Sequence, residues 1–298
     1  MEKKKRLIII DSNALLYRSF YALPPLTTKS GQATGAVYGF LLTLFKAITD
    51  LGAGYVVACF DTKGKTFRHE KFEEYKAQRA LCPKELISQI PIVKEVLSVL
   101  NIPIFEKEGV EADDLIATIC KKVDRRVEVF IVSGDLDNTQ LVNENIKVYT
   151  LGRGIKETII YDMNKVKERF GVSPNQIVDF KALAGDLSDN IPGVSGIGKK
   201  TAAEILQRYG SVEGLYKELS TDTAVLKPKI KETLRKNKAI VLMSQELAKM
   251  KDDVDISFEI ERCKFGGFNV ALAKELFKKL EFHSLISRIE KLYNNKRD

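Results

Sequence analysis

The sequence predicts an α/β protein, with a helix-covered parallel sheet in residues 1–170 and a mostly helical region in residues 171–298. In the first part, short apolar strand patterns alternate with helical patterns, as they do in parallel sheets covered by helices. After Gly171 the strand patterns fade, and short helices separated by Gly and Pro take over. The chain of 298 residues is 44% hydrophobic, which is enough for one large core or two modest ones.

Each element of the first part has its own signal. Apolar runs that stop at an acidic residue or a turn predict three strands, at residues 6–10, 55–60 and 127–132. Apolar side chains that recur every three or four positions predict helices at residues 34–50, 83–100 and 112–123. Thr34 is a suitable N-cap for the first of these helices.

The second part is predicted to be helical throughout. Helical patterns cover residues 175–184, 199–209, 229–250 and 269–280. We place the boundary between the two parts near residue 171, and we find neither an internal repeat nor a low-complexity segment.

The composition excludes several classes of protein and site. The net charge of +8 favours a polyanionic partner such as nucleic acid. Four cysteines without metal-binding spacing and only two histidines argue against a disulfide framework, a zinc site and histidine-based catalysis. No apolar run approaches the roughly 18–20 residues of a membrane helix, and the stretch after the basic residues 2–6 is too short for a signal peptide. We therefore expect a cytoplasmic protein.

Acidic residues follow all three predicted strands. Asp11 and Asp61 come directly after a strand, and Asp135 and Asp137 follow the third strand by a few residues. Because the carboxyl ends of parallel strands meet at one edge of a sheet, where reactive clefts lie, we expect these acids to gather there. A single acid at such a place is most often a helix cap or a turn residue, so the prediction depends on the whole set.

Further acids come from two other segments. Glu111, Asp113 and Asp114 open a predicted helix, and Asp186 and Asp189 lie in the second part of the chain. Crowded carboxylates repel one another unless protons or divalent cations compensate. Because the set offers only oxygen ligands, it favours Mg²⁺ or Mn²⁺ over Zn²⁺. Two such ions about 3.5–4 Å apart can activate a water and stabilise the leaving oxygen of a phosphodiester.

A glycine-rich segment, residues 191–202, is the second functional signal. A phosphate-binding P-loop would need Ser or Thr at Lys200, and a dinucleotide-binding turn would need Gly at Thr201. A helix-hairpin-helix fits better, because backbone N–H groups at the start of its second helix can hold a DNA phosphate. An ordinary turn between two helices is the alternative. The residues predicted to contact DNA here are Gly193, Gly196, Gly198, Lys199, Lys200 and Thr201.

Aromatic and basic residues are mixed in residues 67–79, after the second strand. Lys76 and Arg79 are three positions apart, so on a helix they would share a face from which to hold a phosphate above the acids. Arg68 is a further candidate for DNA contact. The alternative is a solvated helix held by pairs of opposite charges.

Six segments, taken in order along the chain, resemble one known family. They are Ile10–Asn13, Phe60–Arg68, Tyr75–Arg79, Gly109–Asp114, Ser133–Asp137 and Gly185–Thr201. Together they resemble the 5′→3′ exonuclease domain of bacterial DNA polymerase I, within the flap-endonuclease-like structure-specific 5′-nucleases. Leu136 departs from the pattern, because a basic residue is usual between these two aspartates. We expect this change to alter the surroundings of the acids and not to abolish activity.

The resemblance implies a PIN-like nuclease domain followed by a helix-three-turn-helix DNA-binding region. It implies two Mg²⁺ ions, replaceable by Mn²⁺ and bound in part through water, with the ligands Asp11, Asp61, Glu111, Asp113, Asp114, Asp135, Asp137, Asp186 and Asp189. It also implies that Lys76 and Arg79 belong to a helical arch facing the scissile phosphate, and that Tyr21 stacks on a base. It further implies a K⁺ ion at the glycine-rich turn and a monomer that acts alone, or fused to or beside DNA polymerase I.

We therefore expect a metal-dependent 5′ nuclease that removes 5′ flaps and RNA primers in DNA replication and repair, cleaves 5′ ends and leaves 5′-phosphates. Two other functions are compatible with parts of the pattern. A DNA-binding module without activity would use the acids only structurally, and metal-dependent turnover distinguishes it. A PIN-type ribonuclease would cleave RNA, and a comparison of flap DNA with RNA substrates distinguishes it.

Overall fold

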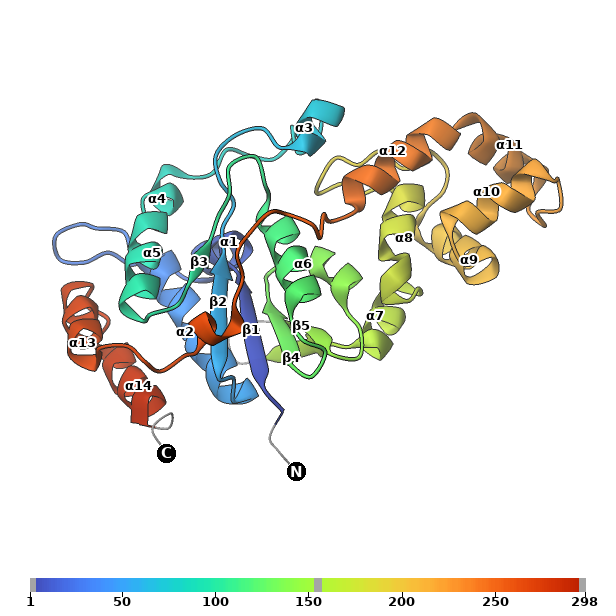
Figure 1. The fold of residues 1–298 in the computed structure, drawn as a ribbon. Coiled ribbons are helices and arrows are strands. Elements are labelled where there is room, and N and C mark those ends of the chain that lie inside the picture. The colour runs from blue at the N-terminus through green and yellow to red at the C-terminus, as the bar shows by residue number, and fades with distance from the viewer. Residues whose placement is uncertain (1–3, 153–156, 295–298) are drawn as a thin grey trace.

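The computed structural model describes residues 4–152 and 157–294 as a six-stranded sheet flanked by helices, with further helices extending to one side (Figure 1). The strand order is β3-β2-β1-β4-β5-β6; neighbouring strands are parallel except for β6, which is antiparallel to β5. The strands are β1 (Arg6–Asp11), β2 (Tyr55–Cys59), β3 (Ile104–Phe105), β4 (Glu128–Val132), β5 (Ile146–Leu151) and β6 (Thr158–Tyr161).

The three strands predicted from the sequence lie side by side as β2, β1 and β4. Successive side chains of a strand point to opposite faces. Ile8 and Ile10 of β1 therefore join the core on one face of the sheet, and Leu7 and Ile9 join the core on the other. Because helices cover both faces, the central residues of these strands are apolar on both sides, and charged residues occur only at strand ends, as at Arg6 and Glu128. The parallel α/β fold predicted for the first part is confirmed.

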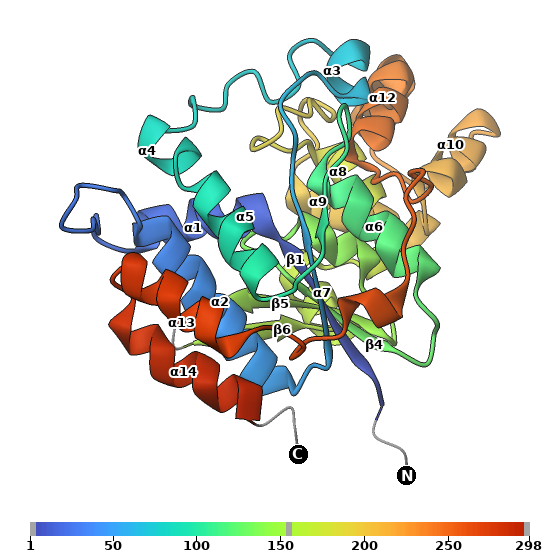
Figure 2. The same cartoon turned by 60° about the vertical axis from the view of Figure 1, so that its left-hand side comes forward.

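Helices from both ends of the chain cover the first face. They are α1 (Ser12–Ala22), α2 (Gly35–Leu51), α4 (Lys84–Ile87), α5 (Ile90–Val99), α13 (Val270–Lys279) and α14 (His283–Asn294). The last two lie beside α2, and Phe277 and Leu285 share a core with Phe40 and Leu44 (Figure 2). The predicted second part is therefore divided in space, since its last two helices pack on the sheet of the first part.

The second face and the side of the molecule are helical as well. α6 (Ala112–Lys122) and α7 (Met163–Phe170) lie at the second face. The helices beyond them are α8 (Ile177–Ala184), α9 (Lys199–Tyr209), α10 (Val212–Ser220), α11 (Pro228–Lys236) and α12 (Lys238–Ala248). Short 3₁₀ helices are η1 (Asp137–Leu141), η2 (Pro174–Gln176) and η3 (Ile260–Cys263), and α3 (Phe67–Lys71) lies near the end of α12 (Figures 1 and 2). None of the helices in the described ranges is long and apolar enough to cross a membrane.

Two predicted helices are broken. The helix predicted over residues 83–100 is interrupted between α4 and α5 at Gln89, whose side-chain oxygen accepts the backbone N–H groups of Ala36 and Val37. The helix predicted over residues 229–250 is interrupted at Asn237, whose side chain donates to the carbonyl of Thr233. A side chain that bonds to the carbonyl four residues earlier, as Asn237 does, competes with the backbone hydrogen bonds of a helix. The sequence analysis also missed α1, β3, β5, β6, α7, α10 and α14.

Candidate active site

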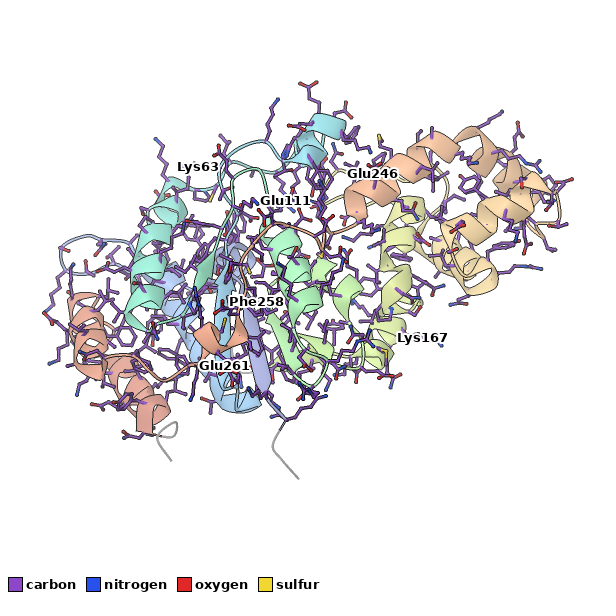
Figure 3. The ribbon with its side chains drawn as sticks, viewed as in Figure 1. Lys63, Glu111, Lys167, Glu246, Phe258 and Glu261 are labelled. Carbon is purple, nitrogen blue, oxygen red and sulfur yellow. The ribbon has the colours of Figure 1, made fainter. Side chains whose placement is uncertain are left out.

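A cleft of about 670 Å³ opens at the carboxyl edge of the sheet. Residues that follow β1, β2 and β4 line it, together with residues of α1, of the loop after α3 and of the turn after α8. The predicted site residues that line it are Asp11, Asp61, Lys76, Arg79, Asp113, Asp135, Asp137 and Asp189. Glu111, at the start of α6, lies at the same edge of the sheet (Figure 3). The structure thus brings together acids that are far apart in the sequence.

Four acids of the cleft make no ion pair within 4.0 Å among the described residues. They are Asp11, Asp61, Asp113 and Asp135. Asp11 accepts a hydrogen bond from Ser133 Oγ at 2.7 Å, and Asp113 accepts one from Asn138 Nδ2 at 3.1 Å. Asp61 accepts the backbone N–H of Ala112 at 2.7 Å. These bonds orient the carboxylates but bring no positive charge.

Without a paired base, Asp11, Asp61 and Asp113 have raised pKa values. Burial raises the pKa of Asp11 to about 7, and the charges of Asp61 and Asp135 add to the shift against the hydrogen bond from Ser133. Loss of water contact, with the charges of Asp11 and Asp135, raises the pKa of Asp113 well above its ordinary value. The cleft therefore needs either protons or an added cation to hold these carboxyl groups together.

Lys76 and Arg79, the two predicted phosphate-binding residues, pair with acids beside the cleft. Lys76 Nζ lies 2.8 Å from a carboxylate oxygen of Glu111, and Arg79 Nη2 lies 2.5 Å from one of Asp189. Burial disfavours the charged form of Glu111, but Lys76 and Arg68 outweigh this effect and lower its pKa. Both bases are therefore held at the cleft by acids in the absence of DNA.

The segment that carries these two bases is not the helix that its spacing predicts. Only Phe67–Lys71 is helical, and Lys76 has a left-handed backbone with φ of 55°. The backbone N–H of Lys76 donates to the carbonyl of Asp189 at 3.0 Å, and Arg79 Nε donates to the carbonyl of Ser188 at 3.2 Å. The loop after α3 is thus docked on the turn after α8, and this docking brings both bases to the cleft without a shared helical face.

Lys181 of α8 is a site residue that the sequence analysis missed, because no motif marks it. Its Nζ lies 2.5 Å from Asp137 Oδ1 and 2.7 Å from Asp186 Oδ2. Burial disfavours its ammonium, but the two carboxylates outweigh burial and raise the pKa of Lys181. Burial raises the pKa of Asp137 to about 7 against the attraction of Lys181, whereas Lys181 overcomes burial at Asp186 and lowers its pKa to about 2.

Arg68 and Asp114 pair with each other inside the protein. Two guanidinium nitrogens donate to the two carboxylate oxygens at 2.9 and 2.8 Å. Arg68 also donates to the carbonyls of Leu247 and Lys249, both at 2.9 Å. Arg68 is 2% exposed and Asp114 is 1% exposed. Two predictions are therefore corrected: Arg68 is not presented to DNA, and Asp114 does not line the cleft. Together they join α3, α6 and the end of α12.

Tyr21 lies outside the lining of the cleft and is 63% exposed. Its ring lies 5.2 Å from that of Tyr17 and 5.2 Å from that of Phe20, measured between ring centroids. Tyr17, one turn earlier on α1, does line the cleft. Tyr17 was not among the predicted site residues, although its spacing of four residues from Tyr21 would place both tyrosines on one face of a helix.

The glycine-rich turn between α8 and α9 has a buried side and an exposed side. Gly193 is buried with φ of 59°, and a Cβ atom there would lie 2.2 Å from the backbone nitrogen of Gly185. Its predicted contact with DNA is therefore corrected to a packing contact between two backbones. The rest of the turn is exposed at Gly196, Gly198, Lys199 and Lys200 and half-buried at Thr201.

The donor set of the cleft fits a hard divalent cation. Its four unpaired acids supply only oxygen atoms, which Mg²⁺ and Mn²⁺ prefer. Asn138, which bonds to Asp113, has a buried side-chain oxygen with no hydrogen-bond partner among the described residues. As the side chains stand, residues 4–152 and 157–294 contain no ready-made group of three Asp, Glu, His or Cys around one point. Ion binding here therefore involves side-chain rotation or water ligands.

Known proteins resemble this chain over nearly its whole length. The family described as 5′-3′ exonuclease, N-terminal resolvase-like domain, matches residues 6–171, and 5′-3′ exonuclease, C-terminal SAM fold, matches residues 172–271. The DNA polymerase I of Bacillus subtilis is 40% identical over 97% of this chain and 33% of its own length. The 5′-3′ exonuclease of Aquifex aeolicus is 38% identical over 97% of this chain and 96% of its own length. The chain thus spans about a third of the polymerase I relatives it matches.

Solved structures share the fold. T5 5′-exonuclease with bound divalent metal ions (zinc) has a TM-score of 0.66 and 24% identity, over 83% of this chain and 90% of that chain. The catalytic core of Rad2 in complex with a DNA substrate has a TM-score of 0.58 and 16% identity, over 93% of this chain and 88% of that chain. These likenesses confirm the predicted order of a parallel α/β domain followed by a helical region.

Proposed function

The chain belongs to the 5′-3′ exonuclease family, and from this premise we propose that it is a divalent-metal-dependent, structure-specific 5′ nuclease. It hydrolyses DNA phosphodiesters at 5′ flaps and 5′ ends, removes RNA primers in replication and repair, and leaves 5′-phosphates. One observation carries the proposal: four acids share one cleft, and none of them forms an ion pair with a base among the described residues. These are Asp11, Asp61, Asp113 and Asp135.

These four acids are the proposed main ligands of Mg²⁺, with Mn²⁺ able to take its place. When bound, the metal lowers the pKa of the attacking water and neutralises charge on the departing oxygen. The chain itself fixes the ligands, because Ser133 and Asn138 hold Asp11 and Asp113 by hydrogen bonds. The acids proposed for a second ion, or for its bound waters, are Glu111, Asp137, Asp186 and Asp189.

Lys76 and Arg79 are proposed to bind the scissile phosphate. In the free protein they pair with Glu111 and Asp189, so both are already aimed at the cleft that the phosphate would enter. Donors fixed in advance stabilise the charge that grows on phosphate oxygens during cleavage. The exposed ring of Tyr21 is proposed to stack on a base beside the cleft.

The exposed part of the glycine-rich turn is proposed to hold the duplex away from the scissile bond. Its backbone N–H groups, with Lys199 and Lys200, would bind a phosphate without selecting a sequence. A K⁺ ion held by carbonyl groups of the turn is proposed to bridge to that phosphate. The flap endonuclease of bacteriophage T5 has been solved with DNA and metal ions, and T5 5′-exonuclease has been solved with divalent metal ions, which supports DNA and a divalent metal as partners.

We further propose that the protein works in the cytoplasm as a monomer, either alone or together with a DNA polymerase I. The Aquifex aeolicus relative is named as a 5′-3′ exonuclease in its own right, which supports activity of a chain of this length.

A substrate comparison tests the function. The chain is incubated with a 5′-flap DNA, a linear duplex with a 5′ end, an RNA-primed duplex and a single-stranded RNA, each with Mg²⁺ or with EDTA. We expect cleavage of the first three with Mg²⁺ only, and release of products with a 5′-phosphate. Binding of flap DNA without cleavage in Mg²⁺ and Mn²⁺ would favour a DNA-binding module, and preference for the RNA would favour a ribonuclease.

A further inference from the structure

The pair formed by Asp137 and Asp186 differs from the four unpaired acids because a cation of the protein lies between its carboxylates. Lys181 Nζ lies 2.5 Å from one oxygen of Asp137 and 2.7 Å from one oxygen of Asp186. The side chain of Lys181 is 12% exposed, that of Asp137 is 18% exposed and that of Asp186 is 14% exposed. One largely buried ammonium thus neutralises two carboxylates that come from different parts of the chain.

The core holds the backbone of Lys181, whereas its two ion pairs hold its ammonium group. Its neighbours Phe180 and Ala182 are buried in the core that α8 shares with α6 and α9. The side chain itself has a flexible four-carbon stem, so the ammonium can move while the helix stays in place. Asp186 is also fixed, because it accepts hydrogen bonds from the backbone N–H and the hydroxyl of Ser188 at 2.8 and 2.6 Å.

Leu136, the residue before Asp137, brings no positive charge to this acid. Leu136 is half-buried and packs against the same apolar core. Among the described residues, Lys181 is the only base within 4.0 Å of Asp137. Asp137 lines the cleft, whereas Lys181 does not. The lysine therefore reaches this acid from the side of α8 and not through the opening that a substrate or ion would use.

We propose that Lys181 is a resident cation that occupies the position between Asp137 and Asp186 where a divalent ion would otherwise bind. The two cations exclude each other, because the same carboxylate oxygens would have to face both. The cleft consequently binds one divalent ion more tightly, at its four unpaired acids, and a second ion more weakly, at Asp137 and Asp186. Lys181 lowers the affinity of the second position. The inference rests on the proposed function, since it concerns ion binding at the same cleft.

Metal binding without DNA tests this assignment. Protein stripped of metal with EDTA and then dialysed is titrated with Mn²⁺, and bound Mn²⁺ is counted by electron paramagnetic resonance. We expect two classes of site in the wild type. In Lys181→Met the weaker class should tighten by about tenfold or more, since a repelling unit charge close to the ion has been removed. The stronger class should change by less than about threefold, because its acids do not contact Lys181.

Three further variants keep the test specific. Lys217→Met removes an exposed lysine of α10 and should leave the Mn²⁺ titration as in the wild type. Lys181→Arg keeps the charge and should not tighten the weaker class. In the double variant Lys181→Met/Asp186→Asn the tightening should disappear, because the carboxylate of Asp186 has been replaced by a neutral amide. If Lys181→Met fails to fold, Lys181→Gln takes its place, because it also removes the charge and should tighten the weaker class in the same way.

The outcomes separate this inference from the proposed function. Wild-type protein that binds no Mn²⁺ would overturn the proposed function itself. Wild-type binding with an unchanged weaker class in Lys181→Met would overturn only the inference and leave Lys181 as a structural link between η1 and α8. Tightening that persists in the double variant, or that also appears in Lys181→Arg, would overturn it as well.

Discussion

Lys76 lies 2.8 Å from Glu111 in the free protein, yet the proposed function requires it to hold a phosphate. Its side chain is 18% exposed and reaches the cleft from the loop after α3. Lys76→Ala should therefore slow single-turnover cleavage of saturating flap DNA by roughly 10²-fold, the scale seen when a donor to the transition state is lost. Lys63→Ala, which removes an exposed lysine of the loop between β2 and α3, is the control and should cleave at the wild-type rate. A loss of affinity with an unchanged single-turnover rate would make Lys76 a docking charge only.

Arg68 is buried and paired with Asp114, so its role is to stabilise the fold. Removing it leaves Asp114 charged in the interior, and removal of one partner of a buried pair costs about 3–5 kcal/mol. Arg68→Met should therefore lower the free energy of unfolding by that amount in a urea titration, and Arg68→Met/Asp114→Asn should recover part of the loss. Asp114→Asn alone should still bind Mn²⁺, because Asp114 does not line the cleft. Equal stability of Arg68→Met and the wild type would contradict the buried pair as a structural link.

The turn between α8 and α9 is the element that the proposed function assigns to the DNA duplex. Lys199 and Lys200 are exposed in the first turn of α9, next to free backbone N–H groups. Lys199→Ala/Lys200→Ala should lower the slope of log affinity against log salt by about 1–2, at about 0.9 per phosphate contact. The loss should be the same for two flap substrates of unrelated sequence, and cleavage at saturating DNA should change little. An unchanged slope, or a loss for one sequence only, would leave the turn as a packing corner between two helices.

Elements with strong apolar periodicity were predictable from the sequence, and short or weakly patterned ones were not. β1, β2 and β4 each contain an unbroken apolar run because both of their faces are covered. β3 has only two residues, and β6 is a half-buried strand at the edge of the sheet, so neither leaves a clear pattern. α1 was missed because its apolar and polar residues are mixed around the helix, as in Leu15, Tyr17 and Ser19.

At the site, the acids were predictable and their partners were not. Strand ends place Asp11 and Asp135 at one edge of the sheet, and topology alone predicts this. Whether an acid pairs with a base depends on contacts between distant segments, such as Lys181 with Asp137 and Arg68 with Asp114. Lys76 lies at the cleft through a left-handed backbone and not through the predicted helix, which spacing alone does not reveal.

Across the whole molecule, bases pair with acids such as Asp114 and Asp137, whereas four acids of the cleft form no ion pair among the described residues. An ion that binds only the folded protein stabilises it, by about 2.7 kcal/mol at a hundredfold excess over its Kd. Mg²⁺ should therefore raise the melting temperature by about 5 °C in a chain of this size.

Asp113→Asn should melt at a higher temperature than the wild type in EDTA, because a crowded carboxyl group is gone, and Mg²⁺ should raise its melting temperature by less. An equal gain from Mg²⁺ in both proteins would mean that Asp113 takes no part in ion binding.

Cleavage by Asp135→Asn tests most directly whether the acids that lack an internal cation perform the reaction. Asp135 lines the cleft and makes no ion pair among the described residues, so we assign it to the metal. Single-turnover cleavage of a 5′-flap DNA in Mg²⁺ should fall by about 10³-fold or more, on the scale of several kcal/mol of lost charge stabilisation. Flap affinity should stay within about threefold, and Asp253→Asn, an exposed control, should cleave normally. Near-wild-type cleavage by Asp135→Asn would contradict the account.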